Sequence, residues 1–138
     1  MKSPILLAGL ILGIATYSYA GPSNHAQPQP QRLHFARGTN SLVIKGHLGK
    51  RYPRPVYIVK TQAGQRLTIR AQGLSKSVDK SIVPLIFVTP PQGKYDGDKT
   101  AEYHTDSTKA GDYRIEVGVN QMATNAHNGP FELRVYAH

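Results

Sequence analysis

The stretch Gly111–Val119, "GDYRIEVGV", decides the fold class of this chain. Apolar side chains occupy every second position from Tyr113 onward, and the charged residues Arg114 and Glu116 lie between them. A period of two is typical of a β-strand with one face in the core and one face in water. The stretch therefore predicts a strand over Asp112–Val119.

The same alternation returns along most of the chain after Arg32. It is found in Arg32–Phe35, Leu42–Leu48, Leu67–Gln72 and Phe131–Tyr136. The run Ile82–Val88 is apolar at both parities, which predicts a central strand with Pro84 at a bulge or near an edge. No window shows helical spacing, and turn-forming residues separate the segments. Residues 32–138 are therefore expected to form an all-β domain, a single antiparallel β-sandwich of jelly-roll type with roughly seven or eight strands.

The first twenty residues are expected to be a signal peptide. Lys2 provides a positive start, Ile5–Ile14 is an apolar run, and small residues at Ser18 and Ala20 suit a signal peptidase. The run is too short to span a membrane, so membrane insertion is not expected. Cleavage near Ala20 would leave a periplasmic or secreted bacterial protein that begins with a flexible, Pro- and Gln-rich leader over residues 21–31.

The expected mature chain is basic and contains no cysteine. Without Lys2 it holds sixteen of the seventeen Lys and Arg residues against eight Asp and Glu, a net charge of +8. Export and the absence of a basic helical face argue against nucleic acid as a partner. The remaining anionic partners are wall polymers and acidic clefts of exported proteins, and simple solubility is the alternative.

Motifs that carry chemistry are absent from the sequence. The six histidines are scattered without metal-ligand spacing, so no metal site is expected. There is no Gly-x-Ser-x-Gly elbow and no phosphate-binding glycine loop. No catalytic residue and no cofactor is therefore predicted, and the chain is not expected to be an enzyme.

Two connections between predicted strands are candidates for binding. In Gly46–Tyr57 the basic residues Arg51 and Arg54 flank Tyr52, and Arg and Tyr are prominent at strong protein contacts. The alternative is a charged connection that keeps a sheet edge soluble. The other connection, Gly118–Pro130, is far longer than a hairpin needs.

Three polar residues of this long connection are the candidates for contact, namely Gln121, Asn125 and His127. Long loops on a rigid sandwich commonly carry binding sites. We therefore interpret Arg51, Tyr52 and Arg54 together with these three residues as a predicted partner-binding set.

The order of these segments resembles the bacterial pre-peptidase C-terminal-like β-sandwich, and within it the small periplasmic inhibitors of goose-type (g-type) lysozyme. The resemblance covers Arg32 to Tyr136 and includes Phe35-x-x-Gly38, Lys45-Gly46, Tyr57 ahead of Ala63-Gly64-Gln65, and Gly111-x-Tyr113. It implies a protein that blocks a lysozyme cleft with loops at one end of the sandwich. Tyr52 with Arg51 falls where the family presents an aromatic loop residue, whereas Gln121 and Asn125 stand where relatives carry arginines.

The function that the resemblance implies is inhibition of a peptidoglycan-cleaving enzyme, most simply a g-type lysozyme, by loop insertion into its active-site cleft. Two alternatives stay open. One is a non-catalytic module that binds anionic wall polymer or glycan. The other is an immunity protein against a wall-hydrolysing toxin.

Overall fold

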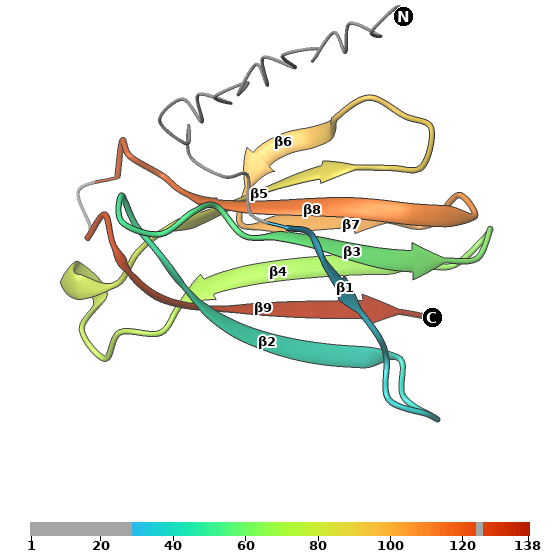
Figure 1. Cartoon of the computed structure of the whole chain (residues 1–138), viewed down its shortest axis with the longest axis horizontal. Helices are drawn as coiled ribbons and strands as arrows, with labels where there is room; N and C mark the ends of the chain where they lie inside the picture. The colour runs from blue at the N-terminus through green and yellow to red at the C-terminus, as the bar shows by residue number, and fades with distance from the viewer. Residues whose placement is uncertain (1–28, 124–125) are drawn as a thin grey trace, which may run out of the picture.

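The computed structural model describes residues 29–123 and 126–138, so the expected signal peptide and residues 21–28 of the expected leader lie outside the described residues. The described part is a two-layer β-sandwich (Figure 1). Its single helical element is a turn of 3-10 helix at Val78–Lys80. Within the same ranges, no helix has the length and apolar character that crossing a membrane requires.

One layer is a five-stranded sheet in the order β1-β3-β8-β5-β6, and the other is a four-stranded sheet in the order β2-β9-β4-β7. All pairings are antiparallel except that of β1 with β3, which is parallel. The expected antiparallel sandwich is confirmed. The strands are β1 (Gln31–Leu33), β2 (Ser41–Leu48), β3 (Val56–Thr61), β4 (Leu67–Gly73), β5 (Pro84–Thr89), β6 (Asp96–Thr100), β7 (Glu102–Thr105), β8 (Gly111–Val119) and β9 (Gly129–Ala137).

The chain changes layers within a single residue at Ala101. β6 ends at Thr100 and pairs with β5 in the five-stranded sheet, whereas β7 begins at Glu102 and pairs with β4 in the four-stranded sheet. One nearly continuous extended stretch thus supplies a strand to each layer. Sequence alternation alone does not separate two such strands, and the described residues contain nine strands in total.

The core lies between the sheets and is built from the predicted alternating positions. Ile115 and Val117 of β8 and Leu133 of β9 are fully buried. Phe131 is also fully buried and packs against Gly46 of β2, where an added Cβ would lie 2.6 Å from the Phe131 ring. Gly46 is therefore the residue that lets Phe131, the largest of the fully buried side chains, fit beneath β2.

Glu132 differs from the expectation that it faces water. It lies on the outer face of β9 as the alternation predicts, yet only 6% of its surface is exposed. β9 is flanked on both sides by β2 and β4, which place Lys45 and Gln72 opposite Glu132. Its carboxylate accepts a hydrogen bond from Nε of Arg134, so the buried charge is paired.

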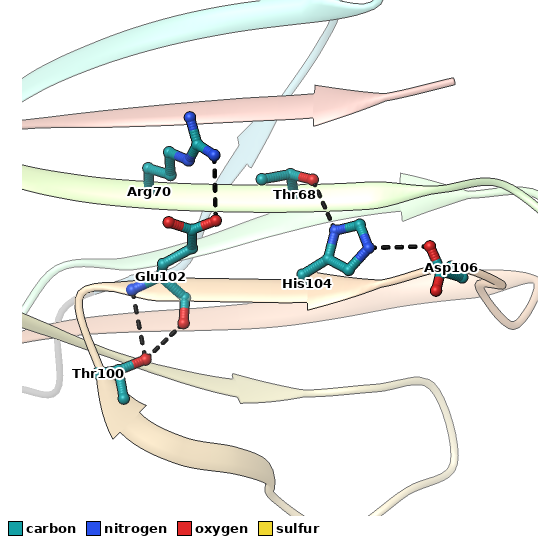
Figure 2. A network of polar contacts seen from close by, with 6 residues as sticks. All are labelled: Thr68, Arg70, Thr100, Glu102, His104 and Asp106. Carbon is teal, nitrogen blue, oxygen red and sulfur yellow. Dashed lines mark hydrogen bonds and ion pairs between the residues drawn. The ribbon is translucent and has the colours of Figure 1, made fainter.

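A polar network covers the outer face of β4 and β7 (Figure 2). The two ring nitrogens of His104 lie 3.0 Å from Thr68 Oγ1 and 2.9 Å from Asp106 Oδ1. Two residues further along each strand, Arg70 Nη2 donates to Glu102 Oε1 at 3.2 Å. The hydrogen bond and charge of His104, and the weaker influence of Arg66, hold the pKa of Asp106 below its ordinary value.

This network predicts a defined acid sensitivity. Because the pKa of Asp106 is lower in the folded chain than in the unfolded one, its contribution to stability is present above the ordinary pKa of an aspartate. That contribution is lost as the pH falls through the folded pKa. We expect His104→Leu to raise the pKa of Asp106 towards its ordinary value, as measured by NMR titration of the side-chain carboxyl carbons.

Asp112 provides the control for this titration. Its pKa is lowered by a hydrogen bond from Arg32, and both residues lie in the five-stranded sheet, away from His104. Asp112 should therefore titrate as before in the His104→Leu variant. An unchanged pKa of Asp106 in that variant would contradict the assignment of the shift to His104.

Candidate functional site

The register of the strands brings the two candidate loops to the same end of the sandwich. The basic loop, residues 49–55, connects β2 to β3, and the long loop, residues 120–128, connects β8 to β9. Leu48, the last residue of β2, pairs with Gly129, the first residue of β9. Each loop therefore starts or ends beside the other (Figure 1), and we call this region the two-loop end.

The two loops meet where the backbone of Gly49 lies against Asn128. A Cβ placed on Gly49 would lie 2.3 Å from Cβ of Asn128, closer than any real side chain allows. Gly49 also has φ +147°, a conformation that residues with a side chain rarely adopt. Glycine is thus required here for both space and backbone geometry.

Tyr52 stands at the centre of the two-loop end. Its backbone N–H donates to the Gly49 carbonyl at 3.0 Å, which closes a turn. Its ring lies against the His47 ring, with centroids 4.7 Å apart and planes tilted by 48°. The side chain is nevertheless 48% exposed, so Tyr52 is a supported aromatic ring that presents its remaining surface to solvent.

Two hollows adjoin Tyr52. The first, of about 220 Å³, reaches Gln121 and is lined by Leu48, Gly49, Lys50, Tyr52, Arg54, Gly118, Val119 and Gln121. The second, of about 510 Å³, reaches His127 and is lined by Lys50, Arg51, Tyr52, His127 and Asn128. Neither lining contains an acidic residue, whereas Lys50, Arg51 and Arg54 each line one or both hollows, so the charged side chains that line them are basic.

Lys50 and Arg51 are the cations at this end that remain available to a partner. Both side chains are exposed, and neither forms an ion pair with any residue that the structure describes. A guanidinium or ammonium in this condition can meet a carboxylate without first breaking an internal pair.

Arg54 lies differently, along the outer surface of the five-stranded sheet. Its Nη1 is 3.4 Å from Glu116 Oε1, and its guanidinium carbon is 5.9 Å from the centroid of the Phe87 ring. The same guanidinium packs near Gly118, where an added Cβ would lie 3.6 Å from Arg54 Nε. Arg54 thus ties the base of the basic loop to the sheet.

The long loop is organised around Asn120. The Asn120 N–H donates to the Val83 carbonyl at 2.8 Å, and Asn120 Oδ1 accepts the Met122 N–H at 3.0 Å. This side-chain turn projects Gln121 and Met122 outward, and Met122 is 92% exposed. Further along, His127 Nε2 lies 3.1 Å from the Ala123 carbonyl, which steadies the returning part of the loop.

Comparison with known proteins identifies the architecture. No model of a known protein family matches the chain, and no curated protein sequence matches it. Among solved structures, PliG from Aeromonas hydrophila, a periplasmic inhibitor of g-type lysozyme, matches with a TM-score of 0.59 and 22% identity over 79% of this chain and 96% of that one. The chain has the fold of PliG.

Two further structures agree with this result. The PliG of Salmonella Typhimurium matches with a TM-score of 0.55 and 12% identity over 80% of this chain and 98% of that chain. The pre-peptidase C-terminal domain of a Bacillus anthracis collagenase matches with a TM-score of 0.58 and 17% identity over 81% of this chain and 99% of that chain. The resemblance predicted from the sequence is therefore confirmed at the level of the fold.

Within this PliG-like sandwich, five of the six predicted partner-binding residues lie together. Arg51, Tyr52, Arg54, Gln121 and His127 all line one or both of the hollows at the two-loop end. Asn125 lies outside the described residues. No group of three or more potential metal ligands occurs in the described ranges.

The structure adds three residues that the predicted set does not contain, namely His47, Lys50 and Met122. His47 supports Tyr52 from β2, and its position in the alternation identifies it only as an outward-facing residue. Lys50 lines both hollows and Met122 is the exposed tip of the long loop. In the sequence, the positive charge of Lys50 directly before Arg51 and the apolar side chain of Met122 directly after Gln121 were the signals that could have identified these two residues.

Proposed function

We propose that this chain is an exported inhibitor of a lysozyme-type peptidoglycan hydrolase and that the two-loop end is its contact surface. The observation that carries the proposal is the meeting of the basic loop and the long loop around Tyr52, which His47 supports, beside two cations, Lys50 and Arg51, that form no ion pair with a described residue. The PliG fold supports the same reading, because the PliG proteins themselves are named as periplasmic inhibitors of g-type lysozyme.

The chemistry of a lysozyme cleft suits this surface. Glycoside hydrolases generally act with a pair of carboxyl groups on either side of the scissile bond. Lys50 and Arg51 can supply charge-assisted hydrogen bonds to such carboxylates, and Tyr52 can supply rigid contact area with a polar tip. Gln121 and Met122 can add a hydrogen-bonding and an apolar contact beside them.

Arg54 has a supporting role in this proposal. Its contacts with Glu116 and the Phe87 ring hold the start of β3, so the turn that carries Tyr52 is presented in one position. Pre-positioned side chains lose less conformational entropy on binding than mobile ones. The loops then enter or cover the target's cleft as a nearly rigid unit.

The proposal can be tested with the purified mature protein and a panel of wall hydrolases. The panel should include g-type and other lysozymes together with an amidase that cleaves the peptide part of the wall. We expect a saturable loss of lytic activity for at least one lysozyme, most strongly for the g-type enzyme. Calorimetry should show a complex of fixed stoichiometry that persists at moderate salt.

The outcome that would contradict the proposal is inhibition of none of the lysozymes. Binding to wall polymer that weakens steeply with salt, with equal sensitivity to removal of any single cation, would instead indicate the polymer-binding alternative.

A further inference from the structure

A separate hollow of about 350 Å³ lies at the end of the sandwich opposite the two loops. It is bordered by the connection from β5 to β6 and by the connection from β7 to β8 (Figure 1). β8 begins beside this hollow and ends at the long loop, so the strand's length separates the two places. We call it the tyrosine pocket, after Tyr95, Tyr103 and Tyr113 in its lining.

The floor of the tyrosine pocket carries polar groups with unused hydrogen-bonding capacity. The Tyr103 hydroxyl donates to Asp96 Oδ2 at 2.9 Å, and the Tyr113 hydroxyl accepts the Lys109 N–H at 3.1 Å. Among the described residues, neither Asp96 Oδ1 nor the hydroxyl proton of Tyr113 has a partner. Burial raises the pKa of Tyr103, which keeps its phenol protonated as a donor to Asp96.

The rim of the pocket combines an aromatic face with cations. Tyr95 is 43% exposed, and its ring centroid is 6.0 Å from that of Phe87 with a tilt of 45°. Lys94 and Lys109 line the same hollow, and neither forms an ion pair with a residue whose side chain the structure describes. Hydrogen-bond donors (Lys94, Lys109 and the Tyr113 hydroxyl), an acceptor (Asp96) and the Tyr95 ring, which packs near Phe87, therefore line the same opening.

We propose that the tyrosine pocket binds a pyranose sugar that bears a carboxylate. A pyranose has an apolar C–H face that suits Tyr95 and a ring of hydroxyls that both donate and accept, as Asp96 and Tyr113 require. A carboxylate on the sugar can form ion pairs with Lys94 and Lys109 at the rim. This inference does not depend on the proposed inhibition, which uses the other end of the molecule.

The test compares N-acetylmuramic acid with N-acetylglucosamine, two sugars that differ by a carboxylate-bearing ether. Each sugar is titrated into the mature protein and followed by NMR of the backbone amides and tyrosine rings. The acidic sugar is expected to shift signals around the tyrosine pocket and to bind several-fold more tightly. Loss of the Tyr95 face in Tyr95→Ala should weaken binding of both sugars about tenfold, whereas Tyr95→Phe should retain it.

A lysine variant and a distant variant complete the design. Lys94→Gln with Lys109→Gln should abolish the preference for the acidic sugar while leaving the neutral one unaffected. Tyr52→Ala, at the two-loop end, should leave sugar binding unchanged, and Tyr95→Ala should leave hydrolase inhibition unchanged. The two functions can therefore fail independently.

Three results would overturn the inference. One is the absence of saturable shifts at the tyrosine pocket with either sugar. Another is sugar binding by a folded Tyr95→Ala variant with the affinity of the parent protein. Equal affinity for the two sugars in the parent protein would overturn the assignment of an acidic ligand.

Discussion

Replacing Arg51 and Tyr52 together by alanine is expected to raise the inhibition constant for the target hydrolase roughly thirtyfold or more, about 2 kcal/mol of binding free energy. Tyr52 is a half-exposed ring supported by His47, and Arg51 has no ion pair with a described residue. Both side chains can therefore be committed to a partner. The thermal midpoint should change little, because neither side chain is part of the core.

Inhibition assays on the double variant need a control for lost charge. Arg37 is exposed, lies in the connection between β1 and β2 at the opposite end, and forms no ion pair with the described residues. Arg37→Ala removes the same charge and should inhibit like the parent. If the folded Arg51→Ala, Tyr52→Ala variant inhibits as well as the parent, the basic loop is a structural connection and not a contact surface.

Replacing Gly49 by alanine is expected to lower the free energy of unfolding by about 2–3 kcal/mol and to weaken inhibition as well. The added methyl group would occupy the place of the Asn128 side chain and would force an unfavourable backbone conformation. The two loops would have to separate, which changes the hollow that Asn128 lines together with His127. Chemical denaturation and inhibition assays measure the two effects.

A substitution at Gly64 provides a control that distinguishes the cost of the backbone conformation at Gly49 from the cost of the steric clash with Asn128. It has φ +82°, yet a Cβ added there would meet no atom within 4 Å. Gly64→Ala should therefore cost only about 1 kcal/mol of stability and leave inhibition intact. Equal losses for the two variants would show that the contact between the loops contributes nothing measurable.

Alternation was sufficient to predict which side chains of a strand face the core. In β4, Leu67 and Ile69 are fully buried while Arg70 is exposed, as the period of two requires. In β8 the same rule placed Ile115 and Val117 in the core. These outcomes follow from strand geometry, because successive side chains must point to opposite faces of a sheet.

Features that depend on distant neighbours could not be predicted. The burial of Glu132 depends on β9 lying between two strands, and the layer change at Ala101 depends on which sheet offers a free edge. The two-loop end depends on the pairing of Leu48 with Gly129, which are 81 positions apart in the numbering of the chain. Local sequence patterns do not encode such pairings.

Individual side chains of the site show the same limit. The spacing of charges identified Arg51 and Arg54 equally, but only the structure shows that Arg54 is engaged with Glu116, 62 positions away. The support of Tyr52 by His47 likewise arises from the turn closed at Gly49. The sequence can identify candidate residues for a binding surface, whereas the tertiary fold determines which of their side chains remain available to a partner.

The two loops share a property that reaches beyond the site itself. The basic loop passes from the four-stranded sheet to the five-stranded sheet, and the long loop passes back in the other direction. A partner that holds both loops would therefore staple the two layers together at one end. By thermodynamic linkage, such a partner stabilises the whole sandwich in proportion to the logarithm of its free concentration, so the chain would resist unfolding more strongly whenever that partner is present.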